Sequence, residues 1–438
     1  MLKTVLPLLA DRRTRHDAGV AMREALPRAA HAAWAPGKKR QDPVAILTAQ
    51  GESRIAELLP ERIARMRVSP FAFYRGAAAV MAADLASLQH SGLFVQLCGD
   101  AHLANFGSFA SPEGAAVFDV NDFDETLPGP FEWDVKRLAA SFVLCGSFHG
   151  LKPAVCRDLA IRAARHYRRH MIKLAELSPF EVWHSTIDLD YAVSTIEQPR
   201  ERALAKKRLR AARRAHQDHY DLVEKTADGP RFRDQGHTMH VARLQPAMDA
   251  AFAAYRASAP PHLAALFNHY RLADAAFKVV GVGSVGTFCA VGLFASGDGE
   301  LLLLQAKEAQ ASVLEVGLPK SAYAHAGERV VVGQRLMQAQ PDIFLGVPPK
   351  KVGGRYFYVR RLKDSHLAAV GDVLEAELLP FSASLCGRTL ARAHARSGDA
   401  AMIAGYLGHN ESFDEAIGDF AMAYAATAEA DFKAFCAA

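Results

Sequence analysis

Residues 99–105 read Gly99-Asp100-Ala101-His102-Leu103-Ala104-Asn105 and follow a short apolar segment, 93–97, that has the pattern of a buried strand. The glycine permits a tight turn after that strand, and the turn presents Asp100 at its opening. A carboxylate in this place can orient or deprotonate a hydroxyl group, and the side-chain carbonyl oxygen of Asn105 is a suitable ligand for Mg²⁺. The stretch therefore indicates a phosphate site that a metal ion assists.

A second strand pattern, 115–120, leads into the acidic stretch Asp119-Val120-Asn121-Asp122-Phe123-Asp124-Glu125, which carries four carboxylates within seven residues. Clustered carboxylates repel one another unless a cation compensates their charge, and a metal ion is an economical compensator. We therefore expect Asp122 to bind the metal, with Asp119 as a rival because it also follows the apolar strand. An exposed acidic turn is the alternative, and we favour it for Asp124 and Glu125 taken alone.

A glycine-rich stretch with the spacing Gly-x-Gly-x-x-Gly supplies the candidate nucleotide-binding residues Gly281, Gly283, Ser284 and Gly286. A dinucleotide-binding fold would need a helix directly afterwards, whereas 287–294 has the pattern of a strand. The turn at 296–299, Ser-Gly-Asp-Gly, predicts a hairpin to a further strand at 301–307. Two strands around a glycine-rich turn, followed by a strand that bears a lysine, form the arrangement of a kinase nucleotide lobe.

Lys307 is the lysine on that last strand, and we expect it to contact the α- and β-phosphates while loop N–H groups cover them. Such a lysine needs an acidic partner from a helix that follows. Glu328 and Glu315 are both candidates, and the sequence does not choose between them. The later strand at 355–362 resembles the strand that leads to the hinge beside the adenine pocket of kinases.

Helical patterns surround these two regions. Ser69-Pro70 opens an Ala-rich helix over 71–89, a further helix is predicted for 132–148, and both 150–275 and 374–438 read as largely helical. We predict four parts: an N-terminal basic, partly helical segment (1–68), a mainly helical catalytic lobe (69–275), a glycine-rich β lobe that binds the nucleotide (276–365), and C-terminal helices that pack on the catalytic lobe (366–438).

The stretch 99–105 resembles the catalytic loop of aminoglycoside phosphotransferases and related small-molecule kinases, which reads His-Gly-Asp-x-His-x-x-Asn. Cys98 departs from that pattern, because it stands where those enzymes have the first histidine. The resemblance implies that Asp100 orients the acceptor hydroxyl, that Asn105 and Asp122 bind magnesium, and that Asp134 is structural. His102 is assigned to the same catalytic loop, either as a hydrogen-bonded loop residue, which we favour, or in contact with phosphate or the acceptor.

The order of these pieces differs from that of ordinary kinases, in which the glycine-rich lobe precedes the catalytic loop. A circular permutation reconciles the two orders, and chain termini that lie close together at a domain surface make it tolerable. Most of the chain, from 69–76 through 121–126 to the C-terminal helices, closely resembles the bacterial family called domain of unknown function 2252. That family is grouped with kinase-like folds. The expected fold class is α+β, a protein-kinase-like two-lobed fold with permuted lobe order and additional helices.

The 438 residues are half apolar, and the formal net charge of +5 permits anionic ligands without arguing for nucleic acid. The basic stretch 200–214 is read as a solvated helix face rather than a nucleic-acid site, because no aromatic residue is interleaved. Six scattered cysteines, with no CxxC spacing, indicate reduced thiols in a cytoplasmic protein. We expect no secretory signal and no membrane span.

These features together predict a phosphotransferase that uses ATP and Mg²⁺ and acts on a hydroxyl of an unknown small molecule or protein. Nucleotidyl transfer would use the same parts. A non-catalytic, pseudokinase-like nucleotide-binding protein that regulates a partner is the second hypothesis. A magnesium-dependent hydrolase unrelated to kinases is the third, and it predicts that 281–307 lies far from Asp100.

Overall fold

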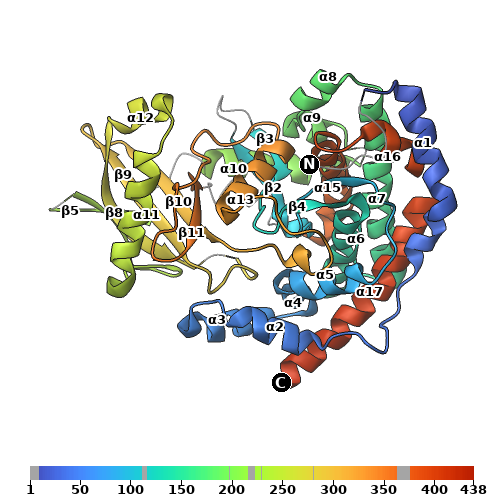
Figure 1. Cartoon of the computed structure of the whole chain (residues 1–438), viewed down its shortest axis with the longest axis horizontal. Coiled ribbons are helices and arrows are strands. Elements are labelled where there is room, and N and C mark those ends of the chain that lie inside the picture. Colours follow the sequence, from blue (N-terminus) through green and yellow to red (C-terminus); the bar gives the residue numbers. More distant parts are fainter. Residues whose placement is uncertain are drawn as a thin grey trace.

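The computed structural model describes residues 9–110, 116–196, 198–215, 222–227, 229–279, 281–362 and 375–438. It is a mixed α/β structure with small sheets, in which a five-stranded sheet lies at one end and the long helices lie at the other (Figure 1). The acidic stretch and the catalytic-loop candidate lie between them, on short strands of the helical part.

The helices of the helical part are α1 (Arg12–Ala25), α2 (Pro43–Gly51), α3 (Leu59–Met66), α4 (Pro70–Gly76), α5 (Ala78–Ala86), α6 (Phe131–Phe148), α7 (Pro153–Ala175), α8 (Pro179–His184), α9 (Leu189–Ser194), α10 (Pro199–Ala215), α15 (Leu379–Ala395), α16 (Ala400–Leu407) and α17 (Ser412–Ala437). Its short strands are β1 (Phe94–Leu97), β2 (Phe106–Ala110), β3 (Ala116–Val120) and β4 (Leu127–Pro130). The predicted strands before residue 98 and at 115–120 are therefore confirmed. β2 and β4 were not predicted, and they pair with β3 and β1 respectively.

Helix α6 runs through the middle of the helical part and is buried on every side from Phe131 to Gly146. A helix that is buried nearly all round is covered by other helices, and α7, α15 and α17 supply that cover. The helix predicted at 132–148 is therefore confirmed, with its start one residue earlier.

The single helix predicted over 71–89 is divided at Ala77 into α4 and α5. The Oγ of Ser69 accepts a hydrogen bond of 3.0 Å from the N–H of Ala72, and Pro70 occupies the first turn, so the predicted start is confirmed. The division lies beside Gly76, where an added Cβ would stand 2.7 Å from the sulfur of Met66. Close packing of α3 on this glycine coincides with the turn, which periodicity alone does not reveal.

The five-stranded sheet has the order β11-β10-β9-β8-β7, and each neighbouring pair is antiparallel. Its strands are β7 (Thr238–Met239), β8 (Tyr270–Lys278), β9 (Cys289–Ser296), β10 (Leu301–Ala309) and β11 (Tyr356–Arg361), and the separate pair β5 (Val223–Thr226) and β6 (Gly229–Phe232) lies beside it. The predicted hairpin is confirmed as β9–β10, and Gly299 of its turn has φ +86°.

Three helices accompany the sheet: α11 (Gln245–Ala257), α12 (Pro261–Phe267) and α13 (Ala326–Met337). Phe252 and Phe267 of α11 and α12 pack into one hydrophobic core with Phe294 of β9. We call the five-stranded sheet with its helices the sheet lobe, and it includes α11, α12 and all of β8. It therefore starts earlier in the chain than residue 276, where we expected the boundary.

The N-terminal segment is part of the helical lobe. Helix α1 packs along α16, and Arg40 joins Asp84 of α5 to Asp431 of α17 through side-chain bonds of 2.6–2.8 Å. Helices α2 and α3 then continue underneath the sheet lobe (Figure 1). No helix within the described ranges is both long enough and apolar enough to span a bilayer.

Candidate functional site

The catalytic-loop candidate, the acidic stretch and the glycine-rich loop line one cavity of about 170 Å³ between the two lobes. Its polar lining comes from Gln50, Arg54, Arg75, Asp100, Asp122, Asp124, Glu125, Gly283, Ser284, Thr287, Glu308 and Gln310. Segments far apart in sequence are thus brought together: Ser284 Oγ lies 3.4 Å from Asp124 Oδ2, a residue 160 positions earlier. The distant placement that the hydrolase hypothesis requires is absent.

The turn that carries Asp100 is held from behind by Asp134 of α6. Its two carboxylate oxygens accept hydrogen bonds from the N–H of Cys98 (2.8 Å) and of Gly99 (3.1 Å). His394 Nε2 lies 3.2 Å from the same carboxylate. Gly99 has φ +85°, and an added Cβ there would stand 2.3 Å from the carbonyl oxygen of Glu125. The structural role expected for Asp134 is confirmed.

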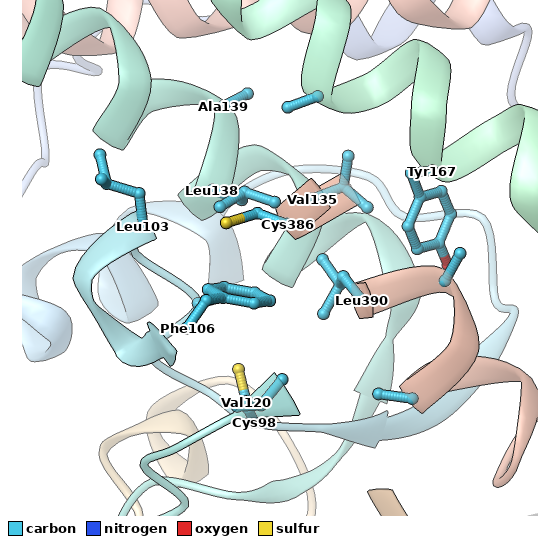
Figure 2. Packing of buried hydrophobic residues seen from close by; sticks show 14 of the residues in the cluster. Cys98, Leu103, Phe106, Val120, Val135, Leu138, Ala139, Tyr167, Cys386 and Leu390 are labelled. Atoms are coloured by element: carbon cyan, nitrogen blue, oxygen red, sulfur yellow. The ribbon is translucent and has the colours of Figure 1, made fainter. Parts of the chain in front are cut away.

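Cys98 is fully buried in the apolar core behind the turn, where the resemblance would have placed a histidine. Figure 2 shows its thiol beside Val120, with Phe106 nearby and with Leu390 of α15 close to the ring. Burial raises the pKa of the Cys98 thiol well above its ordinary value, so this side chain stays neutral. A small apolar residue suits this site, because a buried imidazole would need hydrogen-bond partners.

Asp100 lines the cavity and is paired with Arg137, whose Nε donates a 2.6 Å bond to Oδ1. Arg137 is in turn fixed by a bond of 2.9 Å from Nη2 to the carbonyl oxygen of Tyr74, and it stacks over the ring of that tyrosine at 4.3 Å. Burial raises the pKa of Asp100, although the guanidinium of Arg137 opposes this. Asp100 is thus a positioned carboxylate with enhanced affinity for a proton.

His102 and Asn105 lie next to Asp100 but are not among the residues that line the cavity. His102 is buried, with Nε2 3.8 Å from Asp100 Oδ2, and burial lowers its pKa well below the ordinary value. The Nδ2 of Asn105 donates a 2.8 Å bond to the backbone oxygen of Asp100, so this side chain shapes the loop. Both residues support Asp100 from within the structure.

The structure separates Asp119 from Asp122. Asp119 is buried against Arg392 of α15, to which it is hydrogen-bonded, and it does not line the cavity. Asp122 does line it, with 31% of its side chain exposed. The strand places the two residues in different surroundings, and only Asp122 is available to a ligand of the cavity.

Lys307 meets the acidic stretch from the other lobe. Its Nζ lies 2.5 Å from Asp124 Oδ2 and 3.7 Å from Asp122 Oδ2. The hydroxyl of Tyr358 on β11 donates a 2.5 Å bond to the other oxygen of Asp124. Burial opposes charge on both partners, but their attraction outweighs it, so the pKa of Lys307 is raised and that of Asp124 is lowered. Asp124 is therefore no simple exposed turn residue.

Neither glutamate that we considered as the partner of Lys307 contacts it. Glu328 is exposed on the first turn of α13, and Glu315 accepts a bond from the N–H of Ser321. Arg329 is the residue of α13 that points toward the acidic stretch. It donates hydrogen bonds to the backbone oxygens of Asp124, Thr126 and Gln310. Successive helical residues point about 100° apart, so when Arg329 faces inward Glu328 cannot.

The glycine-rich loop has left-handed backbone at Gly281 (φ +65°) and Gly286 (φ +90°). Its carbonyl oxygens are held by the segment around α2 and α3: Arg65 Nη1 donates to Gly281 (2.6 Å), Arg54 Nη1 to Val285 (2.5 Å) and the N–H of Ile55 to Gly286 (2.8 Å). Sequence reasoning missed Arg54, Gln50 and Glu308. No motif marks Arg54, whose contact with Val285 joins residues 231 positions apart.

Five carboxylates line the cavity: Asp100, Asp122, Asp124, Glu125 and Glu308. Four of them have close partners of their own, namely Arg137, Lys307, the N–H of Val313 and Arg355 for Asp100, Asp124, Glu125 and Glu308. Asp122 lies farther from its partners, since Lys307 is 3.7 Å away and the N–H of Asp124 is 3.2 Å away. Within the described residues, no group of three or more His, Cys, Asp or Glu side chains is arranged to hold a metal alone.

Comparison with known proteins gives one family match. A family model described as an uncharacterized protein conserved in bacteria matches residues 54–438. No curated protein and no solved structure matches the chain. The matched region includes every residue of the cavity lining except Gln50.

Proposed function

The chain belongs to the DUF2252 family of uncharacterized bacterial proteins, and we propose that it is a kinase-like phosphotransferase that uses ATP and Mg²⁺ to phosphorylate a hydroxyl group. One observation carries the proposal. Lys307, on the second strand after a glycine-rich loop, contacts Asp122 and Asp124 at 3.7 Å and 2.5 Å, and these two aspartates line the cavity together with Asp100. Lysine, acidic stretch and catalytic-loop aspartate are the parts that phosphoryl transfer requires.

The element order supports a kinase-like lobe. Strand β8, the glycine-rich loop, β9, β10 with Lys307, helix α13 and β11 follow one another along the chain, and β8 to β11 are neighbours in one sheet. The second lobe of the proposed kinase is the helical part, whose helices come both before and after the sheet lobe in the chain. In this proposal the lobe order is permuted relative to ordinary kinases.

Asp100 is the residue that would receive the proton of the acceptor hydroxyl. Its Oδ1 is engaged by Arg137, which leaves Oδ2 for the acceptor. The burial that raises the pKa of Asp100 brings its basicity closer to the working pH, which favours a general base. Arg137, Asp134 and the left-handed Gly99 hold this carboxylate in place before the substrate arrives.

Asp122 is the residue that would hold Mg²⁺, together with phosphate oxygens. Magnesium keeps several waters and takes only one or two protein carboxylates in kinase sites, so a single, partly exposed carboxylate that lines the cavity fits it. The ion supplies charge neutralisation of the phosphates. Lys307 is held by Asp124 in this structure and would exchange that carboxylate for the α- and β-phosphates.

The cavity volume of about 170 Å³ is below the roughly 300–1,000 Å³ of pockets that enclose drug-sized ligands. It suits the phosphate groups better than a whole nucleotide. We therefore propose that the lobes part to admit the nucleoside, as lobes commonly do in enzymes that close around a substrate.

Calorimetric titration with ATP and Mg²⁺ tests the proposal on the full chain, with Asp122→Asn as the variant and the exposed Glu328→Gln as a control of equal charge change. We expect wild type and Glu328→Gln to bind, and Asp122→Asn to lose the dependence on Mg²⁺. Absence of nucleotide binding by the wild type would overturn the proposal.

Product analysis separates the remaining alternatives, with Asp100→Asn as the inactive control. Release of ADP supports a phosphotransferase, and release of pyrophosphate would point to nucleotidyl transfer instead. Nucleotide binding without any turnover, across a panel of hydroxyl acceptors and the protein itself, would favour a pseudokinase-like regulatory protein.

A further inference from the structure

Arg54 lines the cavity from the segment between α2 and α3. It shares the lining of the cavity with Asp122, Asp124 and Glu125 of the acidic stretch. Its Nη1 donates a 2.5 Å bond to the carbonyl oxygen of Val285, and the next N–H, that of Ile55, donates to Gly286. A Cβ added to Gly286 would stand 3.1 Å from the Cβ of Arg54. The arginine therefore lies directly against the glycine-rich loop.

Among the residues that the structure describes, no carboxylate forms an ion pair with the guanidinium of Arg54. None of the described carboxylates lies within 4.0 Å of its nitrogen atoms, and its buried Nε has no hydrogen-bond partner. Glu125, Asp124 and Glu308 attract it only from a longer range, and burial lowers its pKa. A cation that is withdrawn from water without a counter-ion in contact is costly, so this arrangement is suited to an anion that the cavity receives.

A guanidinium group and a phosphate group are chemically complementary. A planar guanidinium donates two parallel hydrogen bonds to phosphate, and arginine is the side chain best suited to such contacts. The cavity already contains the other phosphate-binding candidates, Gly283 and Ser284, on the loop that Arg54 touches. Lys307, the other cation expected to meet phosphate, is held by Asp124.

We propose that Arg54 binds the terminal phosphates of a nucleoside polyphosphate and couples that binding to the position of the glycine-rich loop. The inference rests on the proposed function and adds a phosphate-binding residue that neither the glycine-rich motif nor the catalytic loop supplies. It makes the segment that begins near residue 50 a component of the nucleotide site.

Arg65 provides a matched control within the same segment. Its Nη1 also donates to the glycine-rich loop, at Gly281, but it does not line the cavity. Arg54→Ala and Arg65→Ala therefore each remove one arginine bond to a loop carbonyl, and only Arg54→Ala removes a cation from the cavity. Arg54→Lys keeps the charge and loses the paired donors.

The test is calorimetric binding of ATP, ADP and AMP, each with Mg²⁺, to wild type and the three variants. Hydrogen bonds to charged groups predict that Arg54→Ala weakens ATP binding about 10- to 100-fold and AMP binding little. The ATP affinity of Arg54→Lys should lie between those of the wild type and Arg54→Ala. Arg65→Ala should weaken the binding of ATP, ADP and AMP by the same small factor. Equal losses for ATP and AMP in Arg54→Ala, or equal ATP losses in Arg54→Ala and Arg65→Ala, would overturn the inference.

Magnesium tripolyphosphate separates failure of this inference from failure of the proposed function. If the wild type binds tripolyphosphate but no nucleotide, and Arg54→Ala and Arg54→Lys weaken that binding, Arg54 is a phosphate-binding residue and the kinase proposal fails. If the wild type binds ATP while both Arg54 variants bind it as the wild type does, only the present inference fails. If Arg54→Ala and Arg54→Lys bind both tripolyphosphate and ATP as tightly as the wild type does, the role of Arg54 in phosphate binding is overturned in every case.

Discussion

Lys307 and Asp124, which are 183 positions apart in sequence, join the two lobes through an ion pair, with Nζ of the lysine 2.5 Å from Oδ2 of the aspartate. Lys307 is 2% exposed on its side chain, and Tyr358 binds the second oxygen of Asp124. The pair therefore fixes the distance between the sheet lobe and the acidic stretch in this closed arrangement. Any ligand that binds Lys307 would have to compete with this pair.

Replacement of Lys307 by Met should destabilise the protein by roughly 2–4 kcal/mol, because Asp124 would remain with its charge only partly compensated. The double variant Lys307→Met with Asp124→Asn should recover part of that loss, since the uncompensated charge is gone. Urea unfolding of the wild type, both single variants and the double variant measures the coupling. Additive losses would show that the pair contributes no coupling energy.

Gly99→Ala should destabilise the protein by at least about 3 kcal/mol, because it adds a left-handed alanine and an overlap with the backbone of Glu125. An added Cβ at Gly99 would lie 2.3 Å from that carbonyl oxygen. Gly281→Ala is the matched control, since Gly281 also has positive φ but its Cβ would meet nothing within 4 Å. It should cost only about 1–2 kcal/mol. Similar thermal midpoints for the two variants would contradict this account.

Asp134→Asn should lower stability by about 2 kcal/mol and disturb the turn that carries Asp100, because the amide NH₂ would face a backbone N–H that now donates to a carboxylate oxygen. Ser141→Ala is a useful comparison, since it removes one bond of 3.0 Å from the N–H of Leu103 in the same loop. It should cost about 1 kcal/mol. Chemical denaturation measures both, and a smaller effect for Asp134→Asn than for Ser141→Ala would argue against the bracing role.

Glu125 should make stability depend on pH. Burial raises its pKa from 4.5 to about 7, so the folded state keeps a proton that the unfolded chain has already lost in this window. Its contribution to stability is therefore fully present below pH 4.5 and is lost as the pH rises through about 7, by roughly 3 kcal/mol.

The measurement for Glu125 is urea unfolding at pH 5 and pH 8, compared between wild type and Glu125→Gln. Glutamine can still accept a hydrogen bond from the N–H of Val313, so Glu125→Gln should keep the fold. Its free energy of unfolding should not fall between pH 5 and pH 8 as that of the wild type does. The exposed Glu328→Gln should behave as the wild type. An equal decline in Glu125→Gln and wild type would assign the pH dependence to other groups.

The parts of the fold that the sequence predicts well are local. The hairpin β9–β10 follows from an Asp-Gly turn between two apolar runs, and α6 follows from a long apolar helix pattern. The predicted helix at 71–89 fails at Ala77, because the break coincides with packing of Met66 on Gly76 from another helix. Local patterns carry no information on that contact.

In the candidate site, too, the sequence predicts local features but not contacts between distant residues. Asp100, Asp122 and Lys307 were identified because each follows or lies on a recognisable strand, and all three lie at or beside the cavity. Asp119 and Asp122 could be separated only by their surroundings, since Arg392 approaches Asp119 from 273 residues away. The orientation of Glu328 depended on the rotation of α13, which packing determines. Proximity in space, rather than residue type, is what sequence reasoning could not supply.

The central helices α6 and α7 are covered by α15 and α17, which are among the last elements of the chain. Synthesis on the ribosome delivers α6 and α7 long before the helices that bury them, whereas β8, β9 and β10 can pair soon after they emerge. The nascent chain thus exposes apolar helix faces until α15 and α17 have been synthesised, and chaperones that shield such surfaces will matter for its yield. Removing the C-terminal helices would leave those faces exposed permanently, so expression of shortened forms should end in aggregation rather than in a smaller folded protein.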